Sequence, residues 1–305
     1  MNVIFYIVLL VFLLLALLII VGSYVIFCIA IKSASAKETV FGKEHAKEEV
    51  PKNNVEFPWL EQVTYVTVRS KDGLILSGYE YINNVSAKWI ICIHGYSGNA
   101  SNMAIYMDHF IRLGHNVLSV DLRGHGRSEG KYYGLGYLDQ YDIAQWIDYT
   151  KQKSPHSQVI LFGISMGGAT ALMSSAYASE EVSFVVTDSV PTDFMSMFTR
   201  ILYGKLGFLT PLVIDIISLY CRIFAGYWLK DASPISIVSE IEVPTLFIHG
   251  QADGFVPVTM GNKLYDKCVA PKQKLIIENA DHTGAVHINP ELYWNTIEAF
   301  LTDQN

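Results

Sequence analysis

The chain has 305 residues, of which 17% are charged, and its formal net charge is −7 at pH 7. With basic residues scattered along the chain, this negative balance leaves no cationic surface for a phosphate backbone, so we expect no nucleic-acid partner. The length suits one large core, because α/β sheets often form single units of more than about 200 residues.

The cysteines show no paired spacing, and two of them fall in runs that read as a membrane helix and a buried strand. The sequence contains no Cys-x-x-Cys or His-x-x-x-His pattern. We therefore expect no disulfide framework, no metal site and no cofactor. The cysteines are Cys28, Cys92, Cys221 and Cys268.

The amino-terminal run over residues 3–31 contains no charged side chain. At about 1.5 Å per residue it exceeds the roughly 30 Å hydrocarbon core of a bilayer, so it is long enough to span a membrane. The alternative is a cleaved signal peptide, for which "ASA" at 34–36 resembles a cleavage site. Because the run is much longer than a signal core and "MN" places no basic side chain before it, we expect an uncleaved anchor.

Lysines follow this run at positions 32, 37, 43 and 47, whereas only the α-amino group precedes it. The positive-inside rule then places the rest of the chain in the cytoplasm, although interleaved glutamates make the orientation less clear. The charged segment over residues 32–57 is typical of a tether between the anchor (residues 1–31) and one folded domain (residues 58–305).

The folded part opens with "VTYVTVRS" and "LILSGYEYI" around "KDG", which predicts a β-hairpin. Short apolar runs then alternate with segments long enough for helices. This order predicts an α/β fold, a mostly parallel sheet with helices on both faces, with its reactive groups at the carboxyl ends of the strands. The runs are residues 89–93, 116–120, 158–162, 183–187, 245–249 and 274–278.

The stretch "LFGISMGGA" places Ser165 where a buried strand turns sharply into a helix of small residues. Such a turn strains the serine backbone and brings it close to neighbouring strands, so only glycine fits at Gly163 and Gly167. A serine hydroxyl needs a base within hydrogen-bond reach and a carboxylate to orient that base. Asp253 and His282 follow later strands in the chain order Ser, Asp, His, and are the candidates.

From about residue 60 to 303 the sequence resembles the α/β-hydrolases, through "HGYSGN", "DLRGHGRSEG", "GISMGG", "HGQADGFVP" and "ADH". It is similar to bacterial serine hydrolases with one amino-terminal membrane anchor. The resemblance implies Ser165 as nucleophile, Asp253 as acid and His282 as base. It also implies an oxyanion hole formed by the backbone N–H groups of Tyr96 and Met166.

Two rivals compete for these roles. His287 lies five residues beyond His282, but we expect it on the following helix and therefore away from the nucleophile. Asp188 directly follows the run over residues 183–187 and is an alternative orienting acid, although the acid-loop match favours Asp253. His94 and His125 belong to glycine-rich loops, where packing and backbone hydrogen bonds are their expected roles.

An insertion at about residues 191–240 contains strongly apolar helical stretches. They are either a small helical cap over the pocket or ordinary packing helices. α/β-Hydrolases carry their lid at this place, so we expect a cap that excludes water and lines an acyl pocket. Such a pocket suits ester or lipid substrates better than charged ones.

The sequence as a whole predicts a membrane-anchored serine hydrolase that cleaves small-molecule or lipid esters through an acyl-enzyme. A thioesterase or a serine peptidase of the same fold is the alternative, and the peptidase ranks lower because no acidic pair is present to bind a peptide amino terminus. A non-catalytic membrane scaffold is the alternative from another class. A scaffold would be free to lose triad groups, whereas all three candidates are present. The sequence indicates no oligomeric state.

Overall fold

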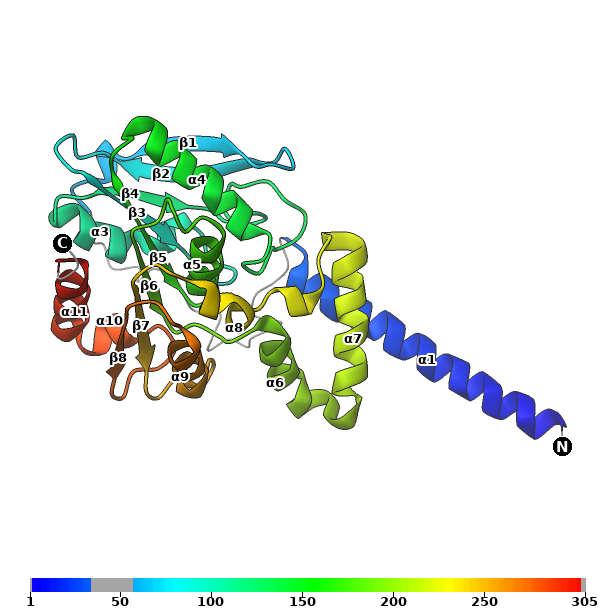
Figure 1. The fold of residues 1–305 in the computed structure, drawn as a ribbon. Helices are drawn as coiled ribbons and strands as arrows, with labels where there is room; N and C mark the ends of the chain where they lie inside the picture. Colours follow the sequence, from blue (N-terminus) through cyan, green and yellow to red (C-terminus); the bar gives the residue numbers. More distant parts are fainter. Residues whose placement is uncertain (1, 34–56, 303–305) are drawn as a thin grey trace.

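The computed structural model describes residues 2–33 and 57–302 of the chain. Helices cover both faces of an eight-stranded sheet, and one long helix, α1 (Asn2–Ile31), extends away from them (Figure 1). The predicted tether over residues 32–57 lies outside the described residues except at its two ends. The domain boundaries drawn from the sequence therefore stay a prediction.

The strands lie in the order β1-β2-β4-β3-β5-β6-β7-β8. β1 and β2 form the expected hairpin, β2 pairs antiparallel with β4, and each later pair across the sheet is parallel. The prediction of a mostly parallel α/β sheet is confirmed, and the six apolar runs correspond to β3 to β8. The bounds are β1 (Thr64–Arg69), β2 (Ile75–Tyr81), β3 (Lys88–Ile93), β4 (Asn116–Val120), β5 (Gln158–Ile164), β6 (Phe184–Asp188), β7 (Thr245–Gly250) and β8 (Lys272–Ile277).

Two hydrophobic cores lie on opposite faces of this sheet because successive side chains of a strand point to opposite sides. In β3, Trp89, Ile91 and Ile93 join one core, whereas Ile90 and Cys92 join the other. The first core is covered by α4 (Asp139–Lys153), α5 (Met166–Tyr177) and α9 (Val258–Lys267), and the second by α3 (Ala104–Arg112), α10 (Ala285–Ile288) and α11 (Pro290–Thr302).

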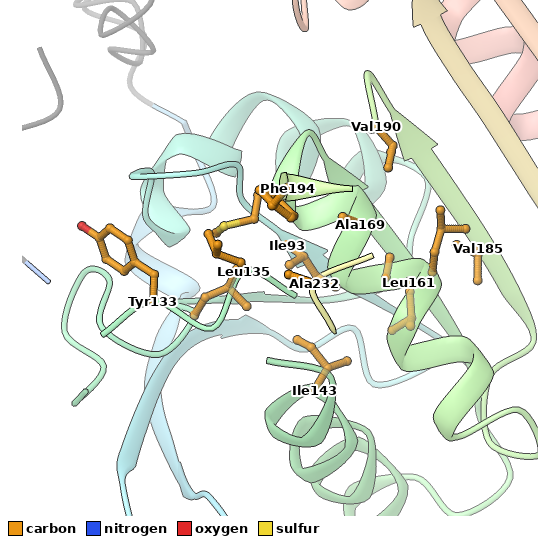
Figure 2. Close-up of a cluster of buried hydrophobic side chains, with 14 of the residues drawn as sticks. Ile93, Tyr133, Leu135, Ile143, Leu161, Ala169, Val185, Val190, Phe194 and Ala232 are labelled. Atoms are coloured by element: carbon orange, nitrogen blue, oxygen red, sulfur yellow. The ribbon is translucent and has the colours of Figure 1, made fainter. Parts of the chain in front are cut away.

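The insertion between β6 and β7 is helical, as expected. Figure 2 shows its Phe194 and Ala232 in one buried cluster with Ile93, Leu135 and Ala169 of the domain. The inner side of the insertion is thus part of the first core. Its elements are α6 (Phe194–Leu206), η3 (Gly207–Leu209), α7 (Thr210–Tyr220), the π-turn η4 (Cys221–Ala225), η5 (Leu229–Asp231), α8 (Pro234–Ile237) and η6 (Val238–Glu240).

The helix α1 has two unlike parts. Most residues from Val3 to Val25 are exposed, and the run Val3–Ile31 has the length and a mean hydropathy, 3.5, that suit a membrane span. The carboxyl end is different, because Phe27, Ala30 and Ile31 are buried in the first core. The carboxyl end of α1 is therefore part of the domain core.

Hydrogen bonds fix this end of α1 to the loop that follows β4. The Tyr133 N–H donates to the Ile31 carbonyl at 2.8 Å, and the Ser33 N–H donates to the Lys131 carbonyl at 2.9 Å. The Ser33 hydroxyl donates to the Gly124 carbonyl at 2.6 Å. The insertion also contacts this end of α1, because Phe224 of η4 packs against Phe27 with 5.7 Å between ring centroids.

We predict that Phe27→Ala lowers the free energy of unfolding of the domain by about 3–5 kcal/mol, the usual cost of emptying a buried phenylalanine site. Phe27 is 1% exposed, whereas Phe12, on the same helix, is 72% exposed and serves as the matched control. Denaturant unfolding of both variants in the same detergent measures the difference. Equal stability of the two variants would contradict the docking of α1.

Candidate active site

The loops at the carboxyl ends of the parallel strands carry the predicted site residues. The turn from β5 into α5 holds Ser165, the loop after β7 holds Asp253, and the loop after β8 holds His282. Because β5, β6, β7 and β8 are neighbours in the sheet, these three loops meet at one edge.

Ser165 sits on a strained turn. Its φ of 52° and ψ of −117° are unusual for a residue with a side chain. A Cβ atom at Gly167 would collide with the carbonyl oxygens of Ile93 and His94, and one at Gly163 would collide with the backbone of Gly167. The two glycines therefore let α5 start directly against β3, and this close approach holds Ser165 in its conformation.

A chain of hydrogen bonds joins the three predicted side chains. His282 Nε2 lies 3.0 Å from Ser165 Oγ, and His282 Nδ1 lies 2.8 Å from Asp253 Oδ2. Both distances are within the range that a nucleophile, a general base and an orienting acid require. The structure thus brings together all three residues; that they act catalytically stays a prediction.

Asp253 is held as a carboxylate. Its Oδ1 accepts the N–H groups of Phe255 at 2.9 Å and Val256 at 2.7 Å. Burial pushes the pKa of Asp253 upward, but hydrogen bonding with His249 and His282 outweighs burial and brings the pKa well below its ordinary value. At neutral pH Asp253 is therefore ionised and able to orient His282 and stabilise its imidazolium form.

The rival acid Asp188 has other partners. It is fully buried and accepts the hydroxyls of Ser189 at 2.9 Å and Tyr293 at 3.1 Å. Burial raises the pKa of Asp188 above its ordinary value, because it outweighs the lowering effect of these two hydrogen bonds. His287 lies on α10 and is exposed, as the sequence predicted. Asp253, rather than Asp188, is thus the carboxylate placed on His282.

The glycine-loop histidines hold the backbone of their loops. His94 Nε2 accepts the Leu122 N–H at 3.1 Å, and His125 Nε2 accepts the Ser97 N–H at 3.2 Å. Their predicted structural roles agree with these contacts. No group of three His, Cys, Asp or Glu side chains that could hold a metal ion occurs within residues 2–33 and 57–302.

The two predicted oxyanion donors flank Ser165. Met166 is the first residue of α5, and the first N–H groups of a helix have no partner inside it. Tyr96 follows β3 in a turn closed by the Gly98 N–H and the Gly95 carbonyl at 3.1 Å. Tyr96 lines the same cavity as Ser165. The backbone amides of Tyr96 and Met166 remain the predicted oxyanion hole.

Two contacts near the site were not predicted. The Tyr96 hydroxyl donates to the Ala30 carbonyl near the end of α1, which ties the turn after β3 to this helix. His249 Nε2 lies 2.8 Å from the Val256 carbonyl and 3.5 Å from Asp253 Oδ2, so it holds the acid loop closed. The "HG" pair at the end of β7 was a usable signal for His249, whereas nothing local to Tyr96 indicates its partner.

A small apolar cavity adjoins the Ser165 hydroxyl. Its volume is about 20 Å³, which is room for about one water molecule. The helix α6 of the insertion forms one wall, so the predicted position of a cap over the pocket agrees with the structure. The lining residues are Tyr96, Ser165, Pro191, Phe194, Met197, Phe198, Ile201, Phe255 and Val256.

A family model described as alpha/beta hydrolase fold matches residues 88–215 of the chain. Among curated proteins, the uncharacterized protein YqkD of Bacillus subtilis is 29% identical over 295 residues, covering 93% of this chain and 96% of its own. An uncharacterized membrane protein of Saccharomyces cerevisiae is 25% identical over 259 residues, covering 83% of this chain and 85% of its own.

Solved structures with the same architecture include an esterase of Pyrococcus furiosus, 25% identical with a TM-score of 0.64, covering 78% of this chain and 91% of its own. A Butyrivibrio proteoclasticus protein solved with ferulic acid bound is 21% identical with a TM-score of 0.63, covering 78% of this chain and 98% of its own. These likenesses agree with the sheet order and the covering helices described above.

We predict that Asp253→Asn lowers kcat by about 10⁴-fold, since the imidazole would lose both its orientation and the charge opposite it. Asp188→Asn is the matched control, because that carboxyl is buried beside the site but bonds Ser189 and Tyr293 instead of His282. Steady-state kinetics on a chromogenic ester compares the two. If Asp188→Asn were the more damaging change, the orienting acid would have to be reassigned.

Proposed function

Because this chain is a member of the α/β-hydrolase superfamily, we propose that it is a membrane-anchored serine hydrolase that cleaves carboxylic esters through an acyl-enzyme. The observation that carries the proposal is the unbroken hydrogen-bond chain from Ser165 through His282 to Asp253 at the strained elbow. The esterase from Pyrococcus furiosus, which shares the architecture, supports an ester-cleaving role.

In the proposed first half-reaction, His282 Nε2 takes the proton of Ser165 Oγ as the oxygen attacks the ester carbonyl carbon. The N–H groups of Tyr96 and Met166 stabilise the resulting oxyanion, and each such donor is worth about 3 kcal/mol in the transition state. His282 then gives its proton to the leaving alcohol. The product of this step is an ester between the acyl group and Ser165.

Water completes the second half-reaction by the same path. His282 takes a proton from the water as its oxygen attacks the acyl-enzyme carbonyl, and then returns a proton to Ser165 Oγ as the free acid leaves. Asp253 stays ionised throughout, because its lowered pKa keeps it a carboxylate beside the imidazolium.

The cavity beside Ser165 favours an apolar acyl group. The helix α6 contributes Phe194, Met197, Phe198 and Ile201 to its lining, and none of the lining side chains is charged. A peptidase that binds a free peptide amino terminus would need a carboxylate there, so the lining supports the ester over the peptide. Aliphatic and aromatic walls bind acyl chains by excluding water from them.

The membrane attachment of the enzyme rests on α1. Its run Val3–Ile31 is long enough to span a bilayer, and the Saccharomyces cerevisiae relative is named a membrane protein. With lysines after the span and none before it, the proposed orientation places the catalytic domain in the cytoplasm.

The direct test of the proposal is covalent labelling by a fluorophosphonate, which reacts with activated serines. We predict that the full chain is labelled and that Ser165→Ala abolishes the label, because the Ser165 hydroxyl is the one aligned with the imidazole of the triad. Mass spectrometry of the labelled peptide identifies the site. Labelling that persists on another serine would remove Ser165 from its role.

We predict that Met197→Trp shifts ester preference toward shorter acyl chains, since a larger ring would fill the cavity beside Ser165. Each methylene that no longer fits costs about 1–3 kcal/mol, so the shift should be graded. Ser196→Trp is the control, because Ser196 is the neighbouring residue of α6 but is exposed. A panel of esters from acetate to laurate measures both profiles, and identical profiles would mean that the cap is packing alone.

A further inference from the structure

The outer surface of the cap exposes large apolar side chains that the proposed reaction does not use. We define the cap face as Tyr203, Phe208, Leu212, Leu219 and Ile223, which are 64%, 88%, 48%, 45% and 61% exposed. The last three share one side of the helical stretch through α7 and η4 because their spacings of seven and four residues return to the same side. Exposed apolar side chains that line up on one side of a helix mark an interaction site.

The cap hairpin does not itself cross a membrane. The stretch Phe194–Ala225 is apolar enough to span, with a mean hydropathy of 1.7, but a third of it is buried in the protein. It is also broken by η3 between α6 and α7. A helical segment with one face in a protein core and an apolar outer face is suited to lie in the surface of a bilayer.

Contacts with α1 place the hairpin at the level of a bilayer surface. The Tyr220 hydroxyl donates to the Ile20 carbonyl at 3.2 Å, and the Tyr220 ring packs against Tyr24 with 5.3 Å between centroids. Counted from Val3, about 20 helical residues cross the roughly 30 Å hydrocarbon core, which places its far edge near Gly22. Tyrosines are enriched at this boundary. Figure 1 shows α7 beside α1 where α1 leaves the domain.

The charges around the cap face fit lipid headgroups. Within residues 201–230 the exposed charged side chains are Lys205, Asp215, Arg222 and Lys230, three cations to one anion. The chain as a whole carries a net charge of −7. An excess of exposed cations in this stretch of an acidic protein matches an anionic membrane surface better than a second copy of the same chain.

We propose that the cap face lies in the headgroup–acyl boundary beside α1 and that the substrate is a lipid ester that enters from the bilayer beneath α6. The substrate class rests on the proposed esterase function; the membrane contact does not. The helix α6 has Met197 and Phe198 on the cavity and Tyr203 on the cap face, so it separates the bilayer from Ser165. An acyl chain that displaces α6 from the membrane side reaches the hydroxyl without passing through water.

The membrane contact is tested by fluorescence in vesicles of phosphatidylcholine and phosphatidylglycerol, with and without brominated acyl chains that quench nearby tryptophan. The full-length variants Phe208→Trp and Val85→Trp are each compared with the unsubstituted chain. Val85 is the matched control, because it is 91% exposed but lies between β2 and β3. Brominated lipid should quench the signal added by Phe208→Trp and not the signal added by Val85→Trp. Absence of quenching in both variants would overturn the membrane contact.

The substrate route is tested with two esters of one leaving group, 4-methylumbelliferyl oleate in the vesicles and 4-methylumbelliferyl butyrate in water. Phe208→Asp and Ile223→Asp should each lower oleate hydrolysis by about tenfold, since a charge in the boundary disfavours insertion, and leave butyrate hydrolysis within about twofold. Val85→Asp should change neither rate. Unchanged oleate hydrolysis in both cap variants would overturn the route.

The outcomes separate the two proposals. If the unsubstituted chain cleaves neither ester while the added fluorescence of Phe208→Trp is still quenched, the esterase function fails and the membrane contact stands. If Phe208→Asp instead converts a dimer to a monomer in detergent and the added fluorescence of Phe208→Trp is not quenched, the cap face belongs to a second copy of the chain.

Discussion

The close approach of Gly167 to the carbonyl oxygen of Ile93 is the contact on which the site depends. Without a Cβ atom at 167, α5 starts directly against β3, and the turn before it takes the positive φ of Ser165. The same approach brings the start of α5, with Met166, toward the turn that carries Tyr96. The proposed nucleophile and the proposed oxyanion donors are thus positioned by one steric condition, and the energetic cost of the strained turn is offset by the parallel sheet around it.

Much of this arrangement could be predicted from the sequence because its signals are local. Apolar runs indicated the strands, glycines on either side of Ser165 indicated the elbow, and polar loops after β7 and β8 indicated Asp253 and His282. The oxyanion donors came only from resemblance, since a backbone N–H has no side-chain signature. The docking of α1 was not predictable, because the contact of Ile31 with Tyr133 joins segments about a hundred residues apart that carry no complementary pattern.

The insertion between β6 and β7 has a buried inner side and an exposed apolar outer side. Its inner residues, such as Phe194, complete the same core that holds α5, so the cap is part of the folded domain. Its outer residues, such as Phe208, are exposed, and in our proposal they contact the bilayer. The helix α6 also forms a wall of the cavity beside Ser165. In our proposal, a change in the membrane contact of the cap would therefore shift the equilibrium position of α6 and with it the size of this cavity.

The burial of the carboxyl end of α1 in the domain has a geometric consequence. The hydrogen bonds donated by Tyr133 and Ser33 join the end of α1 to the loop after β4. They fix the orientation of α1 relative to the domain. With α1 as the anchor, Ser165 is held at a fixed height above one leaflet. Under the proposed function, the protein would diffuse laterally with its membrane and would cleave esters in that membrane and not esters in a facing one.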